Sequence, residues 1–336
     1  MYTQYFNLSE PPFSIAPNPR YLYLSPQHRE ALAHLLYGLS VGGGFVALTG
    51  EVGTGKTTMV RCLLEQLPED VDIAVLFNPR LNARELLASL CDELLIPHPD
   101  SKATIKELID RLNHHLLDTH ARGRRTVALI DEAQNLSLEV LEQIRLLTNL
   151  ETNESKLLQI ILVGQPELRD LLDTENMRQL AQRITARYHL QPLSRQDTAA
   201  YIRHRLAVCG AQEPIFTAAA LAHVYRLSGG IPRLTNLICD RALLGAYSLD
   251  RRKVGIAIVR KAAREVLTTS SVKRPLNRLI AASSLLTLAL VTAHYVSGQT
   301  VRQFFENAFF SNEHTIDRSP PGDMAEMGRG EILIKI

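Results

Sequence analysis

The sequence Gly50-Glu-Val-Gly-Thr-Gly-Lys-Thr57 is the most informative stretch of this 336-residue chain. It matches the pattern Gly-x4-Gly-Lys-Ser/Thr in full, between an apolar run at 45–49 and a helical pattern at 58–66. A strand, a glycine-rich turn and a helix in this order form the context of a phosphate-binding loop, whose N–H groups face phosphate oxygens. We therefore predict a nucleotide-binding loop made of Gly50, Glu51, Val52, Gly53, Thr54, Gly55, Lys56, Thr57 and Thr58.

Lys56, Thr57 and two acidic residues are the candidates for phosphate and metal chemistry. We expect Lys56 to bridge the β- and γ-phosphates and Thr57 to ligate Mg²⁺. An apolar run at 126–130 ends in Asp131 and Glu132. We expect Asp131 to hold Mg²⁺ through water and Glu132 to orient or deprotonate the attacking water; the alternative is that both carboxylates cap the next helix. The predicted cofactors are ATP and Mg²⁺.

Four more polar residues are candidates for sensing the nucleotide. Gln165 follows the apolar run 157–163, and its side chain is predicted to touch the γ-phosphate or the water; the alternative is a turn residue before proline. Arg183 and Arg187 lie four residues apart, which on a helix would place them on one face. One of them is predicted to reach the γ-phosphate of a neighbouring subunit, unless both are solvated or paired. Arg233 is expected near a helix start, where a cation is disfavoured, and is therefore predicted to reach back to the γ-phosphate rather than to be surface charge.

Strand and helix patterns alternate over the first 190 residues. Apolar runs at 45–49, 72–77, 126–130, 157–163 and 188–190 alternate with helical patterns such as 83–95, 105–115 and 138–150. This rhythm predicts an α/β fold, a parallel sheet with helices on both faces. No strand is expected between 194 and 267; the segments 195–208, 218–227, 232–249 and 256–267 read as helices. We expect a nucleotide-binding domain at 1–193 and an all-helical lid domain at 194–268.

A basic segment and an apolar stretch follow the predicted lid. Residues 251–278 contain nine Lys or Arg and one acidic residue, and 279–296 carry no formal charge. We predict a basic linker at 269–278 and one transmembrane helix at 279–296, with a flexible tail at 297–336; the alternative is a buried helix of a soluble domain. The basic flank predicts that the N-terminal domains are cytoplasmic and the C-terminus periplasmic.

Composition excludes several functional classes. The net charge is +2 and gives no sign of a nucleic-acid-binding protein. The four cysteines contain no Cys-x-x-Cys pair, so neither a zinc site nor a disulfide framework is expected. We expect no nucleic-acid partner.

The motifs in this order resemble those of AAA+ ATPases, and more narrowly those of the secretion-pathway A proteins (the ExeA/GspA family). The resemblance covers about residues 1–268. Besides the loop, it rests on the blocks Tyr5-Phe6-Asn7-Leu8, Glu10-Pro-Pro-Phe13, Pro17-Asn-Pro-Arg20-Tyr21-Leu22-Tyr23-Leu24-Ser25, His28-Arg29-Glu30-Ala31-Leu32, Leu129-Ile130-Asp131-Glu132-Ala133-Gln134-Asn135-Leu136 and Gly164-Gln165-Pro166-Glu167-Leu168.

The resemblance implies an ATPase anchored in the bacterial inner membrane by a single span. It implies self-association in a ring or dimer, a B-type inner-membrane partner, and an indirect role in carrying the secretin of type II secretion through the peptidoglycan layer. The resemblance also implies a periplasmic peptidoglycan-binding module, but with forty residues after Val296 we expect neither this module nor direct peptidoglycan binding. The alternatives are a soluble DNA-associated AAA+ protein of the transposition-helper type, a non-catalytic scaffold, and the ATPase of a related pilus or polysaccharide export system.

Overall fold

A five-stranded parallel sheet forms the centre of the first half of the protein. The computed structural model describes residues 1–15, 19–40, 44–77, 80–99, 103–152 and 155–269. Its strands are β1 (Gly44–Gly50), β2 (Val71–Leu76), β3 (Arg125–Ile130), β4 (Leu158–Gly164) and β5 (Ile184–Leu190), in the order β2-β3-β4-β1-β5. All four strand pairs are parallel, so the carboxyl ends of the strands share one edge. The predicted parallel α/β fold is confirmed.

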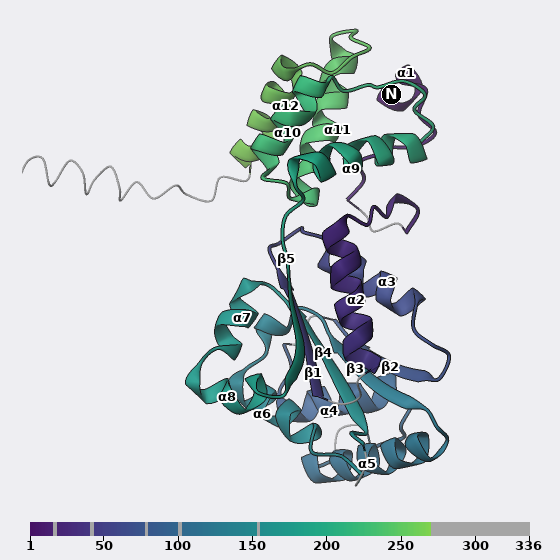
Figure 1. The fold of residues 1–336 in the computed structure, drawn as a ribbon, viewed down its shortest axis with the longest axis vertical. Coiled ribbons are helices and arrows are strands. Elements are labelled where there is room, and N and C mark those ends of the chain that lie inside the picture. Colours follow the sequence, from purple (N-terminus) through teal and green to yellow (C-terminus); the bar gives the residue numbers. More distant parts are fainter. Residues whose placement is uncertain (16–18, 41–43, 78–79, 100–102, 153–154, 270–336) are drawn as a thin grey trace, which may run out of the picture. The chain divides into compact units, whose positions relative to one another are not determined.

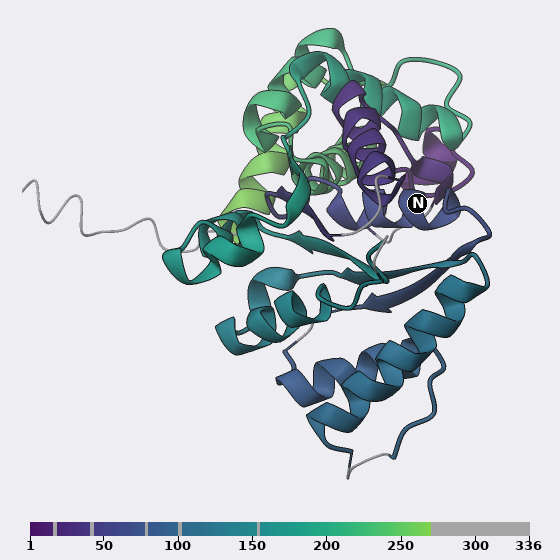
Figure 2. The ribbon, with the colours of Figure 1, turned by 60° about the horizontal axis from the view of Figure 1, so that its bottom comes forward.

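Helices cover both faces of the sheet (Figures 1 and 2). On one face lie α2 (Pro26–Ser40) and α3 (Lys56–Glu65), and on the other α4 (Ala83–Glu93), α5 (Ile105–Ala121), α6 (Leu138–Leu147), α7 (Pro166–Leu172) and the short α8 (Arg178–Ala181). Successive strand residues point to opposite faces. Thus Val46 and Leu48 pack against the helices of the first face, α2 and α3, and Phe45 and Ala47 pack in the core on the opposite face. Because both faces of β1 are buried, its sequence does not alternate between apolar and polar residues.

Side-chain caps fix where the helices of the second face begin. The side chain of Asn82 accepts a hydrogen bond from the backbone N–H of Glu85, whose carboxylate accepts one in return from the N–H of Asn82. Thr104 and Glu107 repeat this reciprocal cap at the start of α5. Each cap satisfies two N–H groups that have no partner within the helix.

The helices α9 (Arg195–Val208), α10 (Ala218–Ser228), α11 (Pro232–Ser248) and α12 (Ile256–Thr269) form the C-terminal helical bundle. All four predicted helices are present, each within two residues of its expected ends. The N-terminal segment, expected to belong with the α/β domain, contributes instead to the core of this bundle. It includes α1 (Tyr2–Tyr5) and buries Phe6, Leu8, Phe13 and Tyr21 against α9, α10 and α11.

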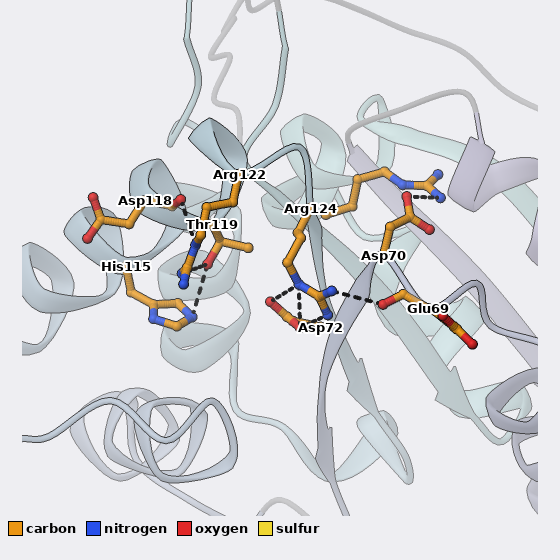
Figure 3. Close-up of polar contacts among 9 residues, drawn as sticks. Glu69, Asp70, Asp72, His115, Asp118, Thr119, Arg122 and Arg124 are labelled. Carbon is orange, nitrogen blue, oxygen red and sulfur yellow. Dashed lines mark hydrogen bonds and ion pairs between the residues drawn. The ribbon is translucent and has the colours of Figure 1, made fainter.

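Ion pairs connect β2 and β3 near the N-terminal ends of these strands, at the end of the sheet opposite the loop (Figure 3). Arg124 contacts the carboxylate of Asp72 through Nε, at 3.1 and 3.2 Å, and through Nη2, and it donates to the carbonyl of Glu69 at 2.9 Å. The hydrogen bonds from Arg124 lower the pKa of Asp72. Arg125 pairs with Asp70 at 3.1 Å. These charges satisfy one another, which indicates a structural role.

Strand β5 begins earlier than the sequence indicated. The interval from Arg183 to Arg187 was expected to be helical, but β5 starts at Ile184, so Arg187 lies within the strand. The argument that both arginines share a helix face is therefore wrong. The physical reason is that β5 is an edge strand, and its exposed residues Thr185 and Arg187 interrupt the apolar pattern.

No helix among the described residues is long and apolar enough to cross a lipid bilayer. The predicted linker at 269–278 overlaps the described residues only at Thr269, which is the last residue of α12. The rest of the linker, the predicted span at 279–296 and the tail at 297–336 lie outside the described residues. Their assignment stays a prediction.

Candidate functional site

The loop between β1 and α3 is a tight turn that only glycine can form at two positions. Gly53 and Gly55 have φ angles of +83° and +110°, and Gly55 is the residue from which α3 begins. A Cβ atom on Gly53 would lie 2.6 Å from Cβ of Arg233, and one on Gly50 would lie 2.7 Å from the carbonyl oxygen of Leu190. The loop is therefore enclosed between β5 and the start of α11.

The ammonium group of Lys56 is buried at the centre of this loop. Its Nζ donates to the carbonyl oxygens of Gly50, at 2.7 Å, and of Glu51, at 3.0 Å. Burial lowers the pKa of Lys56, and the nearby carboxylates of Glu132 and Asp131 oppose this shift. The positive charge of Lys56 thus has backbone partners inside the loop and lies near two carboxylates. Such a combination of charges favours the binding of an anionic ligand together with a cation.

Asp131 and Glu132 follow β3 at the edge of the sheet that carries the loop. Asp131 is buried, and one of its carboxylate oxygens accepts the N–H of Glu132 at 2.8 Å. Burial raises the pKa of Asp131, while this N–H and a hydrogen bond from Thr57 act against the rise. Glu132 has a left-handed backbone with φ of +54°. This conformation costs a residue with a side chain about 1–2 kcal/mol, and such strain is concentrated at functional sites.

Two glutamine amides hold the carboxylate of Glu132. Its Oε2 accepts Nε2 of Gln134 at 2.5 Å and Nε2 of Gln165 at 3.1 Å. Burial pushes the pKa of Glu132 upward, but these two amides and Lys56 outweigh it, so the net shift is downward. Gln165 directly follows β4, which lies between β3 and β1, and so sits between the acidic pair and the loop. Gln134, which we did not single out, fixes Gln165 further by accepting its backbone N–H at 3.0 Å.

Arg183 is held firmly at the C-terminal end of α6. Its Nη1 donates to the carbonyl oxygen of Arg145 at 3.3 Å, to Oγ1 of Thr148 at 2.9 Å and to Oδ1 of Asn149 at 2.7 Å. These contacts tie Arg183 to the residues at the end of α6. Arg183 thus has a clear structural role within its own chain.

Arg187 is exposed on the edge strand β5. Its Nη1 lies 3.1 Å from Oδ1 of Asp173, and its Nη2 donates to the carbonyl oxygen of Ala181 at 3.2 Å. The carboxylate of Asp173 is itself largely exposed. Arg187 and Arg183 do not line the cavity of their own chain described below.

Arg233 brings the C-terminal helical bundle into contact with the loop. It is the second residue of α11, after Pro232, and its backbone N–H donates to the carbonyl of Gly53 at 3.2 Å. Nearby, the N–H of Leu193 donates to the carbonyl of Gly230 at 2.9 Å. The side chain of Arg233 is exposed toward the cavity. A nucleotide between the loop and the bundle would meet this cation.

His28, in the first turn of α2, supports the loop. Its Nε2 lies 3.3 Å from the carbonyl oxygen of Thr54, and its Nδ1 lies 2.7 Å from Oγ of Ser25. Burial lowers the pKa of His28, which favours a neutral ring that donates from one nitrogen and accepts at the other. No motif in the sequence indicated this role; only the family resemblance singled out the block that contains His28.

Arg205 joins the N-terminal segment to α9. It is buried and donates to the hydroxyl of Tyr201 at 2.8 Å and to the carbonyls of Pro12, at 2.6 Å, and Ser14, at 3.0 Å. Its guanidinium stacks over the ring of Tyr21 at 4.6 Å. Nothing local in the sequence indicated the contacts with Pro12 and Ser14, because these residues are 193 and 191 positions away from Arg205.

These elements enclose a cavity of about 430 Å³. This volume falls within the usual range of ligand sites, roughly 300–1,000 Å³. The walls come from the N-terminal segment, the loop, the ends of β3 and β4 and the bundle. The predicted residues that line it are Val52, Gly53, Thr54, Gly55, Lys56, Thr57, Thr58, Glu132, Gln165 and Arg233.

Comparisons with known proteins agree with this geometry. The AAA domain family matches residues 40–172. Over 266 residues the chain is 61% identical to General secretion pathway protein A of Aeromonas hydrophila, a match that covers 79% of this chain and 48% of that protein. The chain therefore spans about half the length of this curated relative.

Similar solved structures include Drosophila ORC bound to DNA, with a TM-score of 0.60 and 20% identity over 80% of this chain and 66% of that chain. CDC6P from Pyrobaculum aerophilum gives a TM-score of 0.59 and 21% identity over 76% of this chain and 70% of that chain. At this identity the two structures show the fold alone. The AAA+ P-loop fold and the predicted resemblance to the secretion-pathway A proteins are both confirmed.

Proposed function

We propose that the protein is an ATPase that binds and hydrolyses ATP in the cavity between the loop and the bundle. One observation carries the proposal: Lys56, Glu132 and Gln165 converge on a single cavity from the carboxyl ends of β1, β3 and β4. Ligands of open parallel sheets bind at this edge.

Each residue has a task that follows from its position. The loop N–H groups and Lys56 bind the phosphates, with Lys56 exchanging a carbonyl of its own loop for a phosphate oxygen. Glu132 accepts a proton from the attacking water, because its lowered pKa keeps it ionised and Gln134 and Gln165 fix its direction. Gln165 and Arg233 contact the γ-phosphate. The bundle acts as the lid that closes over the nucleotide.

Thr57 and Asp131 fit a magnesium ion. The carboxylate of Asp131 is buried beside the hydroxyl of Thr57, with which it shares a hydrogen bond. Carboxylate, hydroxyl and phosphate oxygens are the hard ligands that Mg²⁺ prefers. When bound, the ion would neutralise charge on the phosphates.

A neighbouring copy of the chain completes the site in this proposal. Arg187 is the better candidate for an arginine that acts on a neighbour, because it is exposed on an edge strand and pairs only at the surface. Arg183 already bonds to three groups of its own chain. Association into a ring or dimer would bring Arg187 to the γ-phosphate of the next subunit.

We further infer that the ATPase is anchored in the bacterial inner membrane and supports type II secretion, by carrying the secretin through the peptidoglycan layer with a B-type partner. The 61% identity to General secretion pathway protein A supports this inference, as does the apolar stretch 279–296 after a basic segment. The N-terminal domains would face the cytoplasm and the C-terminus the periplasm.

The variant Glu132→Gln tests the proposed reaction. Its amide cannot take the proton, so turnover should fall by about 10²–10⁴-fold while ATP remains bound. The matched control is Glu139→Gln, which alters an exposed carboxylate in the first turn of α6 and should leave turnover unchanged. Phosphate release and retention of labelled ATP measure the two effects. Normal turnover by Glu132→Gln would remove this residue from the mechanism.

A further inference from the structure

The outer surface of the bundle carries a cluster of cations on α10 and α12. Val259, Ala262 and Ala263 of α12 are buried in the core of the bundle. The residues on the opposite side are exposed, and several are basic. We name the basic face after its four exposed members: Arg226, Arg260, Lys261 and Arg264.

Two cations of the basic face, Arg226 and Arg260, lie near the same histidine. Burial lowers the pKa of His223 on α10, and the charges of Arg226 and Arg260 lower it further. Both arginines therefore lie within electrostatic reach of one point, although they belong to different helices. The one acidic residue of α12, Glu265, lies 3.9 Å from Arg241 of α11. The four exposed cations of the basic face outnumber the one acidic residue of α12.

The position of α12 in the chain suggests what this field attracts. Nine residues, 270–278, separate the end of α12 from the apolar stretch that begins at Leu279. Fully extended, nine residues reach at most roughly 32 Å. Three of the nine, Lys273, Arg274 and Arg278, are also basic. If 279–296 crosses the membrane, α12 is tethered close to the lipid headgroups.

We propose that the basic face docks on the anionic phospholipid surface of the membrane. The proposal rests on the membrane anchor of the proposed function and adds a second, electrostatic contact made by the bundle itself. Each Lys or Arg close to an anionic bilayer strengthens its attraction by a factor of about five. The same cations could attract nucleic-acid phosphates, but the short tether to an apolar stretch favours the membrane.

Docking would connect the membrane to the nucleotide site. Helix α12 packs on α11, and α11 begins at the contact between Arg233 and Gly53. A bundle held at the lipid surface therefore also holds one wall of the cavity there. Closure of the bundle over a nucleotide would then act on the membrane-proximal side of the protein.

Energy transfer from a labelled cysteine to the lipid surface tests the docking. All four native cysteines are buried, so an exposed cysteine introduced at Ala257 of α12 takes the fluorophore selectively. The full chain is reconstituted with acceptor lipids, in neutral phosphatidylcholine vesicles or in vesicles with about 30% phosphatidylglycerol. A label at the exposed residue Ala207 of α9 is the positional control.

The expected result is that transfer from residue 257 rises in anionic vesicles and falls at high salt, with a smaller change at residue 207. The double variant Arg260→Gln/Arg264→Gln should lower the ratio of docked to undocked protein by about thirtyfold. The matched variant Arg195→Gln/Arg203→Gln removes two exposed cations from α9 and should leave this ratio unchanged.

Three results would overturn the proposal in distinguishable ways. Release of the chain from neutral vesicles by alkaline carbonate would refute the anchor, and the docking with it. Retention of the chain, with equal transfer in neutral and anionic vesicles, would refute the docking alone. Binding of a DNA duplex that is lost in Arg260→Gln/Arg264→Gln, without any effect of anionic lipid, would assign the basic face to nucleic acid instead.

Discussion

Replacement of Gly53 by alanine tests whether the C-terminal helical bundle rests on the phosphate-binding loop. The new methyl carbon would lie 2.6 Å from Cβ of Arg233 and 3.3 Å from Cγ2 of Ile231. Carbon atoms normally approach to about 3.5–4.0 Å, so α11 must move away by roughly 1 Å. That movement lengthens the hydrogen bond of 3.2 Å from the N–H of Arg233 to the carbonyl of Gly53.

The magnitude can be separated from backbone strain by a second glycine. Gly210 has a φ of +86°, close to the +83° of Gly53, but no atom lies within 4 Å of a Cβ placed on it. Gly210→Ala should therefore cost only the strain of a left-handed alanine, about 1–2 kcal/mol. Gly53→Ala should cost the same strain plus a weakened hydrogen bond of about 0.5–1.5 kcal/mol and the steric displacement of α11.

Thermal unfolding and ATP titration together measure both parts. We expect Gly53→Ala to unfold at a lower temperature than Gly210→Ala, at about 2–4 °C for each additional kcal/mol. ATP affinity should fall at least tenfold in Gly53→Ala and stay unchanged in Gly210→Ala, because only the first variant separates the walls of the cavity. Equal stability and equal ATP affinity in the two variants would refute the contact between loop and bundle.

Three further predictions follow from single contacts. Gln165→Ala removes an amide that stabilises the charged form of Glu132, so the acidic limb of the pH–rate profile should move to higher pH; an unmoved limb would argue against this contact. Arg187→Ala should lower turnover by more than a hundredfold at unchanged Tm, whereas Arg183→Ala should lower the free energy of unfolding by about 1–2 kcal/mol; the reverse pattern would exchange their roles. His28 has a pKa below its ordinary value of 6.5, so its contribution to the free energy of unfolding is complete above that pH and is lost as the pH falls below it. Between about pH 7.5 and 5.5, His28→Gln should therefore lose less of its free energy of unfolding, measured with urea, than the parent protein does. An equal loss in the two proteins would exclude His28 as a source of the pH dependence.

The predictable part of the fold is the part encoded locally. The loop, the acidic pair and Gln165 each follow an apolar run that is buried on both sides, so their strands were evident and their meeting at one edge followed from parallel pairing. The order of the strands then placed Gln165 between the loop and the acidic pair. Here the sequence was sufficient because burial, strand period and turn chemistry agree.

The missed part depends on contacts between distant segments or on partial exposure. Strand β5 is an edge strand whose residues alternate between half-buried and exposed, so its polar first half, including Arg187, resembled helix. His28 and Gln134 act through backbone carbonyls and side-chain amides, which leave no periodic signal in the chain. The membership of the N-terminal segment in the bundle core depends on pairs such as Phe13 and Phe216, whose rings meet edge to face at 6.2 Å.

The N-terminal segment is what makes the cavity respond to the bundle as a whole. Arg205 binds two carbonyls of this segment, at Pro12 and Ser14, so a movement of α9 must carry these residues along or break two hydrogen bonds of a buried guanidinium. Loss of a partner by a buried charged group costs far more than an exposed ion pair contributes. Further along the chain, in the first turn of α2, His28 contacts the carbonyl of Thr54 in the loop. Displacement of the bundle can therefore affect the phosphate site through two sets of contacts: directly through Arg233, and through Arg205 and His28 on the other side of the cavity. A variant that breaks one set should weaken the response of the loop without abolishing it.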